Sequence, residues 1–289
     1  MYDFLLKMYS VLPMGIKRII MKCIHFMLCL RGLYIDINLV DHCNLNCKGC
    51  DNYSPIAQQN FIEKEKLFHD LERLDKLLGR QLKCVRFMGG EPLLHPDICE
   101  ILLNSRSILT EKELLIISNG TLLPKMDARF WEICRDCKIE IMLTKYPIKF
   151  DYDSAIDKIN SYGIKCGAFN KEALKTLFRK PLDVNGAQDK ALQFDLCLNA
   201  NRCVALRDGK LFTCTTIPTV EHLNKYFDLK FDVCKEDYLD IYENHTAHQV
   251  RHFLNRPIPF CRYCKNHGEQ FGIEWSTSNK EVSEWVDFD

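Results

Sequence analysis

The sequence has no excess of charge of either sign. Its 289 residues include 39 lysines and arginines and 39 aspartates and glutamates, so the formal net charge is zero. A chain without a bulk charge gives no electrostatic reason to expect nucleic acid as a partner, and we expect none. It also has no low-complexity tract and no internal repeat of fixed period. With 47% hydrophobic residues, it can bury a core the size of one large domain with a smaller appendage.

The beginning of the sequence lacks a basic and then apolar segment followed by a small-residue cleavage site. We therefore expect a cytoplasmic protein whose cysteines are reduced. The apolar stretch at residues 19–30 is too short to span a bilayer, and Lys22 and His25 interrupt it. We expect residues 1–31 to form an amphipathic helical arm that closes one end of the core. A helix lying on a membrane is the alternative, because basic residues flank the stretch: Lys7, Lys17, Arg18 and Arg31.

Cysteine is far more frequent than in ordinary proteins, with 16 residues. A secreted chain would use so many cysteines for disulfides, and a reduced chain would use them for metal binding or catalysis. Many of them fall into tight clusters with the spacing of metal ligands, so we favour the second explanation. Three others lie in predicted strands or helices beside apolar residues and are expected to be small core residues: Cys84, Cys99 and Cys166.

The first half of the chain alternates between strand-like and helix-like segments. Alternating or apolar runs predict strands at residues 34–40, 84–88, 114–118, 139–144 and 164–168. Apolar residues at helical spacing predict helices at residues 63–78, 96–106, 127–137 and 153–162. This order is typical of a parallel sheet with crossover helices. We predict an α/β fold, a partial (β/α)6 TIM-like barrel, whose site lies at the carboxyl ends of the strands.

Three cysteines follow the first predicted strand within eight residues: Cys43, Cys47 and Cys50. Soft thiolate ligands suit iron–sulfur clusters and zinc. Three of them would leave one iron of a four-iron cluster without a protein ligand, which is the open position that a catalytic centre needs. A zinc knuckle is the alternative, with His42 as the fourth ligand.

A CxxxCxxC loop after the first strand of such a chain resembles the radical S-adenosylmethionine (radical SAM) superfamily. The second predicted strand ends in a turn that matches the GGEP motif of that superfamily: Gly89, Gly90, Glu91 and Pro92. Two glycines let backbones approach closely, and a glutamate offers a carboxylate to a cationic amine. The third predicted strand ends in residues similar to the strand end that contacts the ribose or carboxylate of the cofactor in the family: Ser118, Asn119, Gly120 and Thr121.

The resemblance implies a chemistry and a set of cofactors. It implies a [4Fe-4S] cluster that binds S-adenosylmethionine, accepts one electron and cleaves the carbon–sulfur bond to give a 5′-deoxyadenosyl radical. An external one-electron donor of the flavodoxin or ferredoxin type is then expected as a partner. The Gly89–Pro92 turn would hold the methionine amino group. The match covers roughly residues 32 to 170.

A second group of cysteines lies in the last third of the chain: Cys197, Cys203, Cys214, Cys261 and Cys264. The segment between Cys203 and Cys214 predicts a β-hairpin that turns at Asp208–Gly209. The spacing resembles the SPASM and twitch modules of the family, and five candidates fit one auxiliary [4Fe-4S] cluster of the twitch type. The family spacing favours Cys197, whereas a hairpin places Cys203 opposite Cys214, so both stay candidates. A zinc ribbon is the structural alternative.

The domain division that follows has three parts. Residues 1–31 form the helical arm, residues 32–180 the radical SAM partial barrel, and residues 181–289 the small cysteine-rich module, which ends in a helix near residues 280–285. The further pair Cys134 and Cys137 falls at a predicted helix end, where packing is its expected role.

Polar residues of one strand parity would point into the lumen of a barrel. The candidates for substrate contact are Asp36, Asn38, Arg86 and Thr144. They could equally face outward or pair with one another. Lys145 and Tyr146, near the end of the fourth predicted strand, are candidates for the proton transfer that accompanies radical chemistry.

The function expected from these features is hydrogen abstraction from a small substrate. The small twitch-bearing members of the family suggest oxidation (dehydrogenation) or epimerisation of a sugar- or aminocyclitol-type compound. A peptide-modifying maturase of the RiPP type is an alternative, although the segment before Cys43 is too short for the peptide-binding domain that such enzymes often carry. A non-catalytic iron–sulfur or zinc module is a third possibility, against which the GGEP turn argues.

Overall fold

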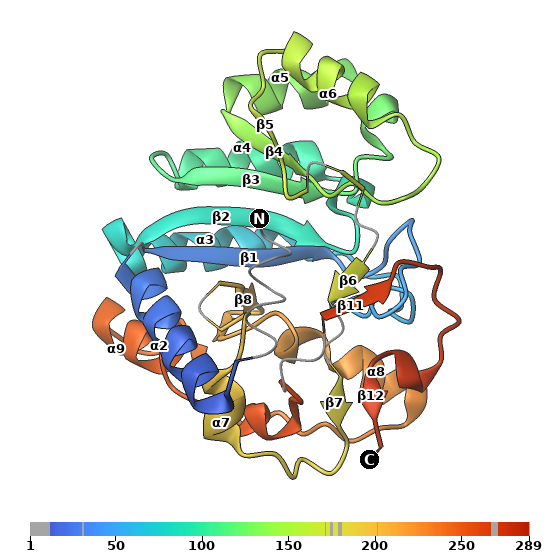
Figure 1. Cartoon of the computed structure of the whole chain (residues 1–289). Helices are drawn as coiled ribbons and strands as arrows, with labels where there is room; N and C mark the ends of the chain where they lie inside the picture. The colour runs from blue at the N-terminus through green and yellow to red at the C-terminus, as the bar shows by residue number, and fades with distance from the viewer. Residues whose placement is uncertain are drawn as a thin grey trace.

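The computed structural model describes residues 12–30, 32–170, 172–173, 176–178, 181–200, 202–266 and 271–288. These residues form one eight-stranded sheet and two small two-stranded sheets (Figure 1). The strand order in the large sheet is β10-β9-β8-β1-β2-β3-β4-β5. The strands are β1 (Leu33–Val40), β2 (Leu82–Gly89), β3 (Glu113–Ser118), β4 (Ile139–Leu143), β5 (Cys166–Ala168), β6 (Thr176–Phe178), β7 (Leu182–Asp183), β8 (Val204–Arg207), β9 (Lys210–Phe212), β10 (Tyr238–Asp240), β11 (Phe271–Glu274) and β12 (Val286–Asp287).

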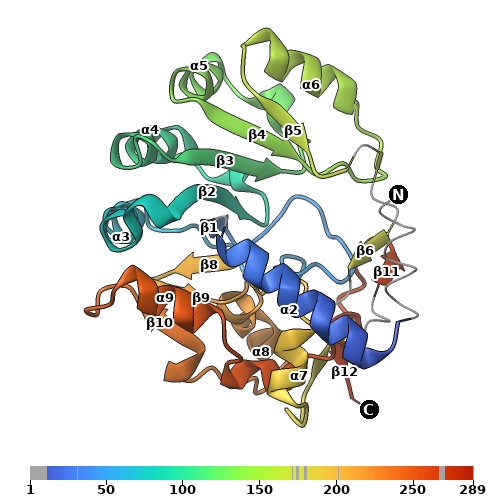
Figure 2. The ribbon, with the colours of Figure 1, turned by 60° about the vertical axis from the view of Figure 1, so that its left-hand side comes forward.

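Helices connect the strands and cover the sheet. Figure 2 shows α3, α4 and α5 side by side on the outer face of strands β2 to β4. The α-helices are α2 (Met14–Leu30), α3 (Lys64–Leu78), α4 (Ile98–Ile108), α5 (Ala128–Asp136), α6 (Tyr152–Ser161), α7 (Lys190–Asp195), α8 (Glu221–Phe227) and α9 (Ala247–Leu254). Short 3-10 turns lie at Gly79–Gln81, Pro92–Leu94, Leu123–Lys125, Ile217–Thr219, Lys235–Asp237, Pro259–Tyr263 and Val282–Glu284.

The predicted α/β fold is confirmed in the first half of the chain. Strands β1 to β5 pair in parallel in chain order. A single helix connects each strand to the next, and these connecting helices are α3, α4, α5 and α6 in turn. The sixth parallel strand has a different origin from the one expected. It is β8, which pairs with the free side of β1 instead of following β5.

Apolar residues at the predicted periods form the core between the sheet and these helices. In β1 the residues Ile35 and Ile37 are fully buried, and the intervening positions carry Asp36 and Asn38. Helix α3 buries a leucine stripe at helical spacing, in which Leu67 and Leu71 are members. Burial of this kind contributes about 1.5–3 kcal/mol for each large apolar side chain. It fixes the strand ends that carry the motifs.

The last third of the chain is joined to the same sheet. Strands β8, β9 and β10 extend it beyond β1, so the division expected at residue 180 does not coincide with a break in the sheet. The predicted hairpin is confirmed: β8 and β9 pair antiparallel around Asp208 and Gly209, both of which have positive φ. Helix α3 holds this turn, because Asp70 accepts a hydrogen bond from the Gly209 N–H at 2.9 Å.

The predicted helix at residues 280–285 is wrong. A 3-10 turn at Val282–Glu284 is followed by strand β12, which pairs in parallel with β7. The carboxylate of Glu284 explains the difference. It accepts hydrogen bonds from the Asn279 N–H at 2.8 Å and from the Gly49 N–H at 3.3 Å, which holds the segment against another part of the chain.

The described part of the helical arm, α2, packs against the cysteine-rich part. Lys22 and Arg18 form ion pairs with Asp195 of α7, and His25 Nε2 lies 2.8 Å from the Cys197 carbonyl oxygen. Among the described residues, no helix combines the length and the apolar character needed to cross a membrane. Residues 1–11 and 31 of the predicted arm lie outside the described residues.

Candidate active site

The cluster loop begins directly after β1 and carries Cys43, Cys47 and Cys50. Cys47 is 8% exposed. The pKa of Cys43 is raised to about 12 and that of Cys47 to about 11, mainly by burial and in smaller part by neighbouring thiols: Cys50 and Cys47 act on Cys43, and Cys50 acts on Cys47. Three poorly solvated thiols that raise one another's pKa fit a bound cationic group, because such a group compensates the thiolate charge. The donor set therefore fits an iron–sulfur cluster.

Two observations bear on the zinc alternative. The His42 ring packs edge-on against Phe61, with ring centroids 5.1 Å apart, and its buried Nδ1 has no hydrogen-bond partner among the described residues. Within the described ranges, no three histidine, cysteine, aspartate or glutamate side chains lie as close together as the ligands of one metal ion, and this includes Cys43, Cys47 and Cys50.

The GGEP turn lies directly against the backbone that precedes Cys43. The Gly90 N–H donates to the Val40 carbonyl at 2.7 Å, and the Glu91 N–H donates to the His42 carbonyl at 3.2 Å. A Cβ atom at Gly90 would lie 1.9 Å from the His42 carbonyl oxygen, and one at Gly89 would lie 2.3 Å from that of Val40. Gly89 also has a φ of +128°, which side chains rarely adopt. The two glycines are therefore required for the close approach that the motif predicted.

Glu91 is fully buried and joins the ends of two strands. Its carboxylate accepts hydrogen bonds from the Ser118 hydroxyl at 2.8 Å, from the Asn119 N–H at 3.0 Å and from the Leu93 N–H at 3.1 Å. Burial raises the pKa of Glu91 to about 7, although these hydrogen bonds favour the ionised form. A carboxylate offers about four acceptor positions, so these donors occupy most of them.

The end of β3 reaches the cluster loop through Asn119. Its side-chain amide donates to the Asn44 oxygen at 2.9 Å and lies 3.7 Å from the Cys43 sulfur. Asn44 in turn donates to the Thr121 hydroxyl at 2.7 Å. The three motifs, predicted separately at three strand ends, are therefore in contact around Cys43. Asn44 is a site residue that the sequence interpretation missed.

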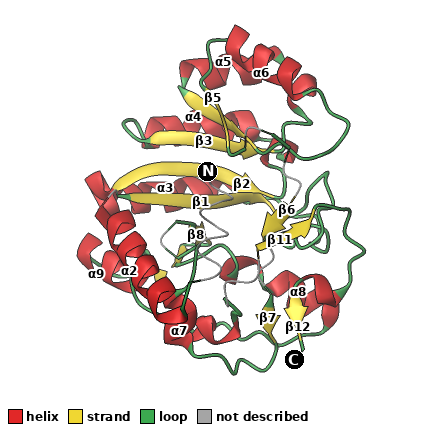
Figure 3. Ribbon diagram, in the orientation of Figure 1, coloured by secondary structure: helices red, strands yellow, loops and turns green. Residues whose placement is uncertain are grey.

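The sequence interpretation also missed the contribution of the C-terminal segment to this site. Residues 276–278 run antiparallel to residues 46–48: the Lys48 N–H donates to the Ser276 carbonyl at 2.9 Å, and the Ser278 N–H donates to the Asn46 carbonyl at 2.8 Å. The small sheet of β6 and β11 leads into this segment and lies beyond the carboxyl ends of β1 and β2 (Figure 3). The segment from Trp275 to Trp285 therefore contacts the cluster loop.

Four of the five cysteines in the second group have neighbours in common. Cys197 and Cys214 both raise the pKa of the buried Cys261 thiol, after the larger effect of burial. Burial raises the pKa of the Tyr53 hydroxyl well above its usual value, and the charges of Cys264 and Cys214 contribute to this rise. Cys203 instead interacts with Arg86. The contact with Cys261 supports Cys197 as a member of the group.

The candidate substrate residues divide into two sets. Asp36 and Arg86 form an ion pair with each other, and Arg86 also donates to the Arg202 carbonyl at 2.7 Å, so their polar groups have partners within the protein. Asn38 donates to the Asn52 side chain at 3.3 Å. The Thr144 N–H donates to the Ser118 carbonyl at 2.9 Å, which places Thr144 beside the end of β3.

The Tyr146 side chain lies near the cysteines of the cluster loop, whereas the Lys145 side chain lies near Cys166 of β5. Burial, and then the three cysteines of the loop, raise the pKa of the Tyr146 hydroxyl well above its usual value. Its ring centroid is 6.3 Å from that of Trp275. The charge of Lys145 instead lowers the pKa of Cys166 in β5, which burial raises. Of the two predicted proton-transfer residues, Tyr146 is the one beside the cysteines.

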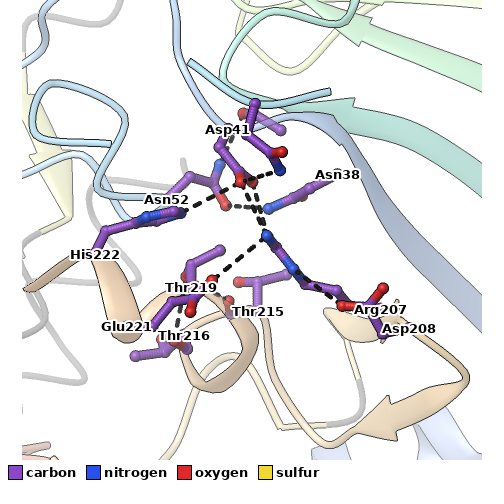
Figure 4. Close-up of polar contacts among 12 residues, drawn as sticks. Asn38, Asp41, Asn52, Arg207, Asp208, Thr215, Thr216, Thr219, Glu221 and His222 are labelled. Carbon is purple, nitrogen blue, oxygen red and sulfur yellow. Dashed lines mark hydrogen bonds and ion pairs between the residues drawn. The ribbon is translucent and has the colours of Figure 1, made fainter. Parts of the chain in front are cut away.

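A buried ion pair fixes the end of β1 to the end of β8 (Figure 4). The Arg207 guanidinium donates to both oxygens of Asp41, at 2.7 and 2.9 Å. Asn60 donates to the same carboxylate at 2.8 Å, and His222 Nε2 lies 3.7 Å from it. Burial raises the pKa of Asp41, but His222 and Arg207 outweigh burial and hold the pKa well below its usual range. A cleft of about 230 Å³ adjoins this group.

Comparison with known proteins gives matches to part of the chain and to the fold. Residues 37–168 match the family model described as the radical SAM superfamily. GTP 3′,8-cyclase from Microcystis aeruginosa is 29% identical over 103 residues, 34% of this chain and 31% of that protein. The enzyme of that name from Helicobacter pylori is 33% identical over 96 residues, 32% of this chain and 29% of that protein. The chain thus covers less than a third of the length of these relatives.

Alignment with a solved structure extends over most of the chain. BtrN in complex with AdoMet and 2-DOIA aligns with 81% of this chain and 93% of its own, at a TM-score of 0.50 and 16% identity. At this identity the likeness concerns the fold.

Proposed function

The chain belongs to the radical SAM superfamily through its residues 37–168, and from this premise we propose that it is an oxidoreductase-type enzyme that abstracts hydrogen from a small sugar- or aminocyclitol-type substrate. The net reaction in this proposal is dehydrogenation or epimerisation. When bound, a [4Fe-4S] cluster with S-adenosylmethionine supplies the reductive cleavage that yields the 5′-deoxyadenosyl radical.

The observation that carries the proposal is the meeting of three strand ends around Cys43. The GGEP turn is hydrogen-bonded to Val40 and His42, and Asn119 of the third strand end lies 3.7 Å from the Cys43 sulfur. A cofactor whose amine, carboxylate and ribose need separate partners beside a cluster requires such a meeting point.

The residues have distinct roles in this proposal. Cys43, Cys47 and Cys50 hold the cluster. The main chain of the Gly89–Pro92 turn holds the methionine amino group, while the Glu91 carboxylate fixes the turn through its three protein donors. Ser118 and Asn119 form the edge that meets the ribose or carboxylate. Tyr146, beside the cysteines, is the candidate for proton transfer.

We assign the second cysteine group to one auxiliary [4Fe-4S] cluster, held by Cys197, Cys214, Cys261 and Cys264. The donor set fits such a cluster, because four thiols from three separated segments have neighbours in common in a poorly solvated region. Tyr53 lies between the two cysteine groups, since Cys50, Cys214 and Cys264 all act on it. This arrangement suits a module that accepts an electron from the substrate radical in a dehydrogenation.

The substrate class rests on the fold and on the residues near Cys43. The likeness to BtrN extends over 81% of this chain and therefore reaches beyond the domain of residues 37–168. That structure contains AdoMet and 2-DOIA. Asn38 lies near the end of β1, and Thr144 and Tyr146 follow the end of β4, so these polar residues are the candidates for substrate contact.

Deuterium transfer tests the proposed function. The reconstituted enzyme is incubated anaerobically with S-adenosylmethionine, a flavodoxin or ferredoxin reductant, and carbon-deuterated aminocyclitols, hexoses or a peptide pool in separate reactions. The proposal predicts deuterium in 5′-deoxyadenosine with a cyclitol or sugar and none with peptides. Deuterium from the peptides alone would favour a maturase and refute the substrate class. A Tyr146→Phe variant should keep S-adenosylmethionine cleavage and lose turnover of the substrate by at least about tenfold.

A further inference from the structure

A tryptophan of the C-terminal segment touches a proposed cluster ligand. The Trp275 indole Nε1–H donates to the Cys47 sulfur, at a distance of 3.3 Å. Cys47 is 8% exposed and Trp275 is half-buried, so the sulfur side of this contact has little access to water. A hydrogen bond to sulfur at this distance is short enough to act on the charge of a thiolate.

The geometry around this contact is fixed by the backbone. Thr277 and Cys47 form an antiparallel bridge, and the hydrogen bonds that flank it, from Lys48 to Ser276 and from Ser278 to Asn46, hold the two segments in one register. The buried Glu284 carboxylate adds hydrogen bonds from the Gly49 N–H and from the Ser278 hydroxyl, the latter at 2.7 Å. The position of Trp275 is therefore fixed by the hydrogen bonds between two segments of the backbone and not by its side-chain contact alone.

We propose that Trp275 is a positioning residue that raises the reduction potential of the cluster held by Cys43, Cys47 and Cys50. This inference rests on the proposed function, because it requires a cluster at that site. It adds that the segment around residues 275–285 controls how readily the cluster accepts its electron.

The physical reason is the extra negative charge of the reduced cluster. Part of that charge is carried by the cysteine sulfurs, so an N–H donor to sulfur stabilises the reduced form more than the oxidised form. The effect is strengthened when the hydrogen bond lies in a poorly solvated region. Loss of the donor should make reduction about tenfold less favourable, and for a one-electron couple tenfold corresponds to about 59 mV.

Trp285 supplies a matched control within the same segment. Its indole N–H donates at 3.0 Å to the Cys50 carbonyl oxygen instead of a sulfur, and its ring packs against Tyr53 with centroids 6.2 Å apart. A Trp285→Phe variant thus removes an indole hydrogen bond to the same loop without removing a donor to sulfur. A merely structural role of the segment would make the two variants alike.

The test is a redox titration of holoenzyme variants followed by electron paramagnetic resonance. The signal followed is the one that changes when S-adenosylmethionine is added, which separates the catalytic cluster from any auxiliary cluster. Trp275→Phe should lower the midpoint potential by about 59 mV. Trp275→His, whose ring nitrogen can donate again, should restore at least half of that shift. Trp285→Phe should change the reduction equilibrium by less than about twofold.

A measurement on the unaltered protein covers the case in which the variants fail to load iron. Wild-type enzyme labelled with ¹⁵N at the indole nitrogen of tryptophan should show coupling between that nitrogen and the cluster spin, and Trp285→Phe should keep it. A wild-type potential in iron-replete Trp275→Phe, or no coupling in the labelled enzyme, overturns the inference and leaves the proposed function intact. A wild-type protein without any reducible cluster refutes the proposed function, and the inference with it.

Discussion

Replacement of Glu91 by glutamine tests the buried carboxylate that joins β2 to β3. Glutamine keeps the shape of the side chain, but one of its two polar ends is a donor. If the amide oxygen keeps the Ser118 and Leu93 hydrogen bonds, the amide nitrogen faces the Asn119 N–H. An unsatisfied buried donor costs about 1–3 kcal/mol. We therefore expect the cluster-free variant to unfold more easily than the wild type under mildly acidic conditions.

The pH dependence gives the sharper result. Burial raises the pKa of Glu91 from 4.5 to about 7 in the folded protein, and a shift of this size corresponds to about 3 kcal/mol. Because the folded-state pKa is the higher one, this stability is fully present below 4.5 and is lost as the pH rises through about 7. Glutamine does not titrate. The stability advantage of the wild type over Glu91→Gln should therefore shrink by about 2 kcal/mol between about pH 5 and about pH 8.

Urea unfolding of the reduced, cluster-free proteins, followed by tryptophan fluorescence at both pH values, measures this difference. Glu132→Gln is the matched control, because Glu132 is exposed on α5, and its difference from the wild type should not change with pH. An advantage of the wild type over Glu91→Gln that is constant with pH, or that grows as the pH rises, would refute the reasoning.

Three further changes test other parts of the site. Gly90→Ala should weaken S-adenosylmethionine binding by at least about tenfold in a calorimetric titration, because its Cβ would lie 1.9 Å from the His42 carbonyl oxygen. Gly15→Ala is the control: its Cβ would meet nothing within 4 Å, so this variant should bind normally. Arg207→Lys loses the two-pronged hydrogen bond to Asp41 and should lower the unfolding free energy by about 1–3 kcal/mol; a loss no larger than that of the exposed Arg135→Lys would contradict this. Cys197→Ala should lose about four irons per chain and Cys203→Ala none, and iron analysis showing the reverse would reassign the auxiliary ligand.

The features that the sequence predicted are those encoded locally. The cysteine loop, the GGEP turn and the SNGT strand end each stand in a short stretch, and the order of strands and helices sets them at one edge of a parallel sheet. The hairpin at Asp208–Gly209 was predictable because two adjacent residues that tolerate positive φ are the signature of that turn.

The features that could not be predicted depend on contacts between distant segments. The Ser118 hydroxyl meets Glu91 only because β2 and β3 are neighbours in the sheet, and Arg207 meets Asp41 only because β8 adds to the free side of β1. Trp275 and Glu284 follow no hydrophobic period that would direct them to the cluster loop. The predicted C-terminal helix was wrong for the same reason, since local propensity there yields to hydrogen bonds with the loop.

The most direct test of the central claim is iron content together with 5′-deoxyadenosine formation in three proteins. These are the wild type, a Cys43/Cys47/Cys50→Ala variant, and a Cys23/Cys99/Cys166→Ala control whose cysteines lie outside both groups. After anaerobic reconstitution we predict about eight irons in the wild type and the control and about four in the variant. With dithionite and S-adenosylmethionine, the wild type and the control should form 5′-deoxyadenosine and the variant should form none. Product formation by the variant, or zinc without product in the wild type, would contradict the assignment of this chain as a radical SAM enzyme.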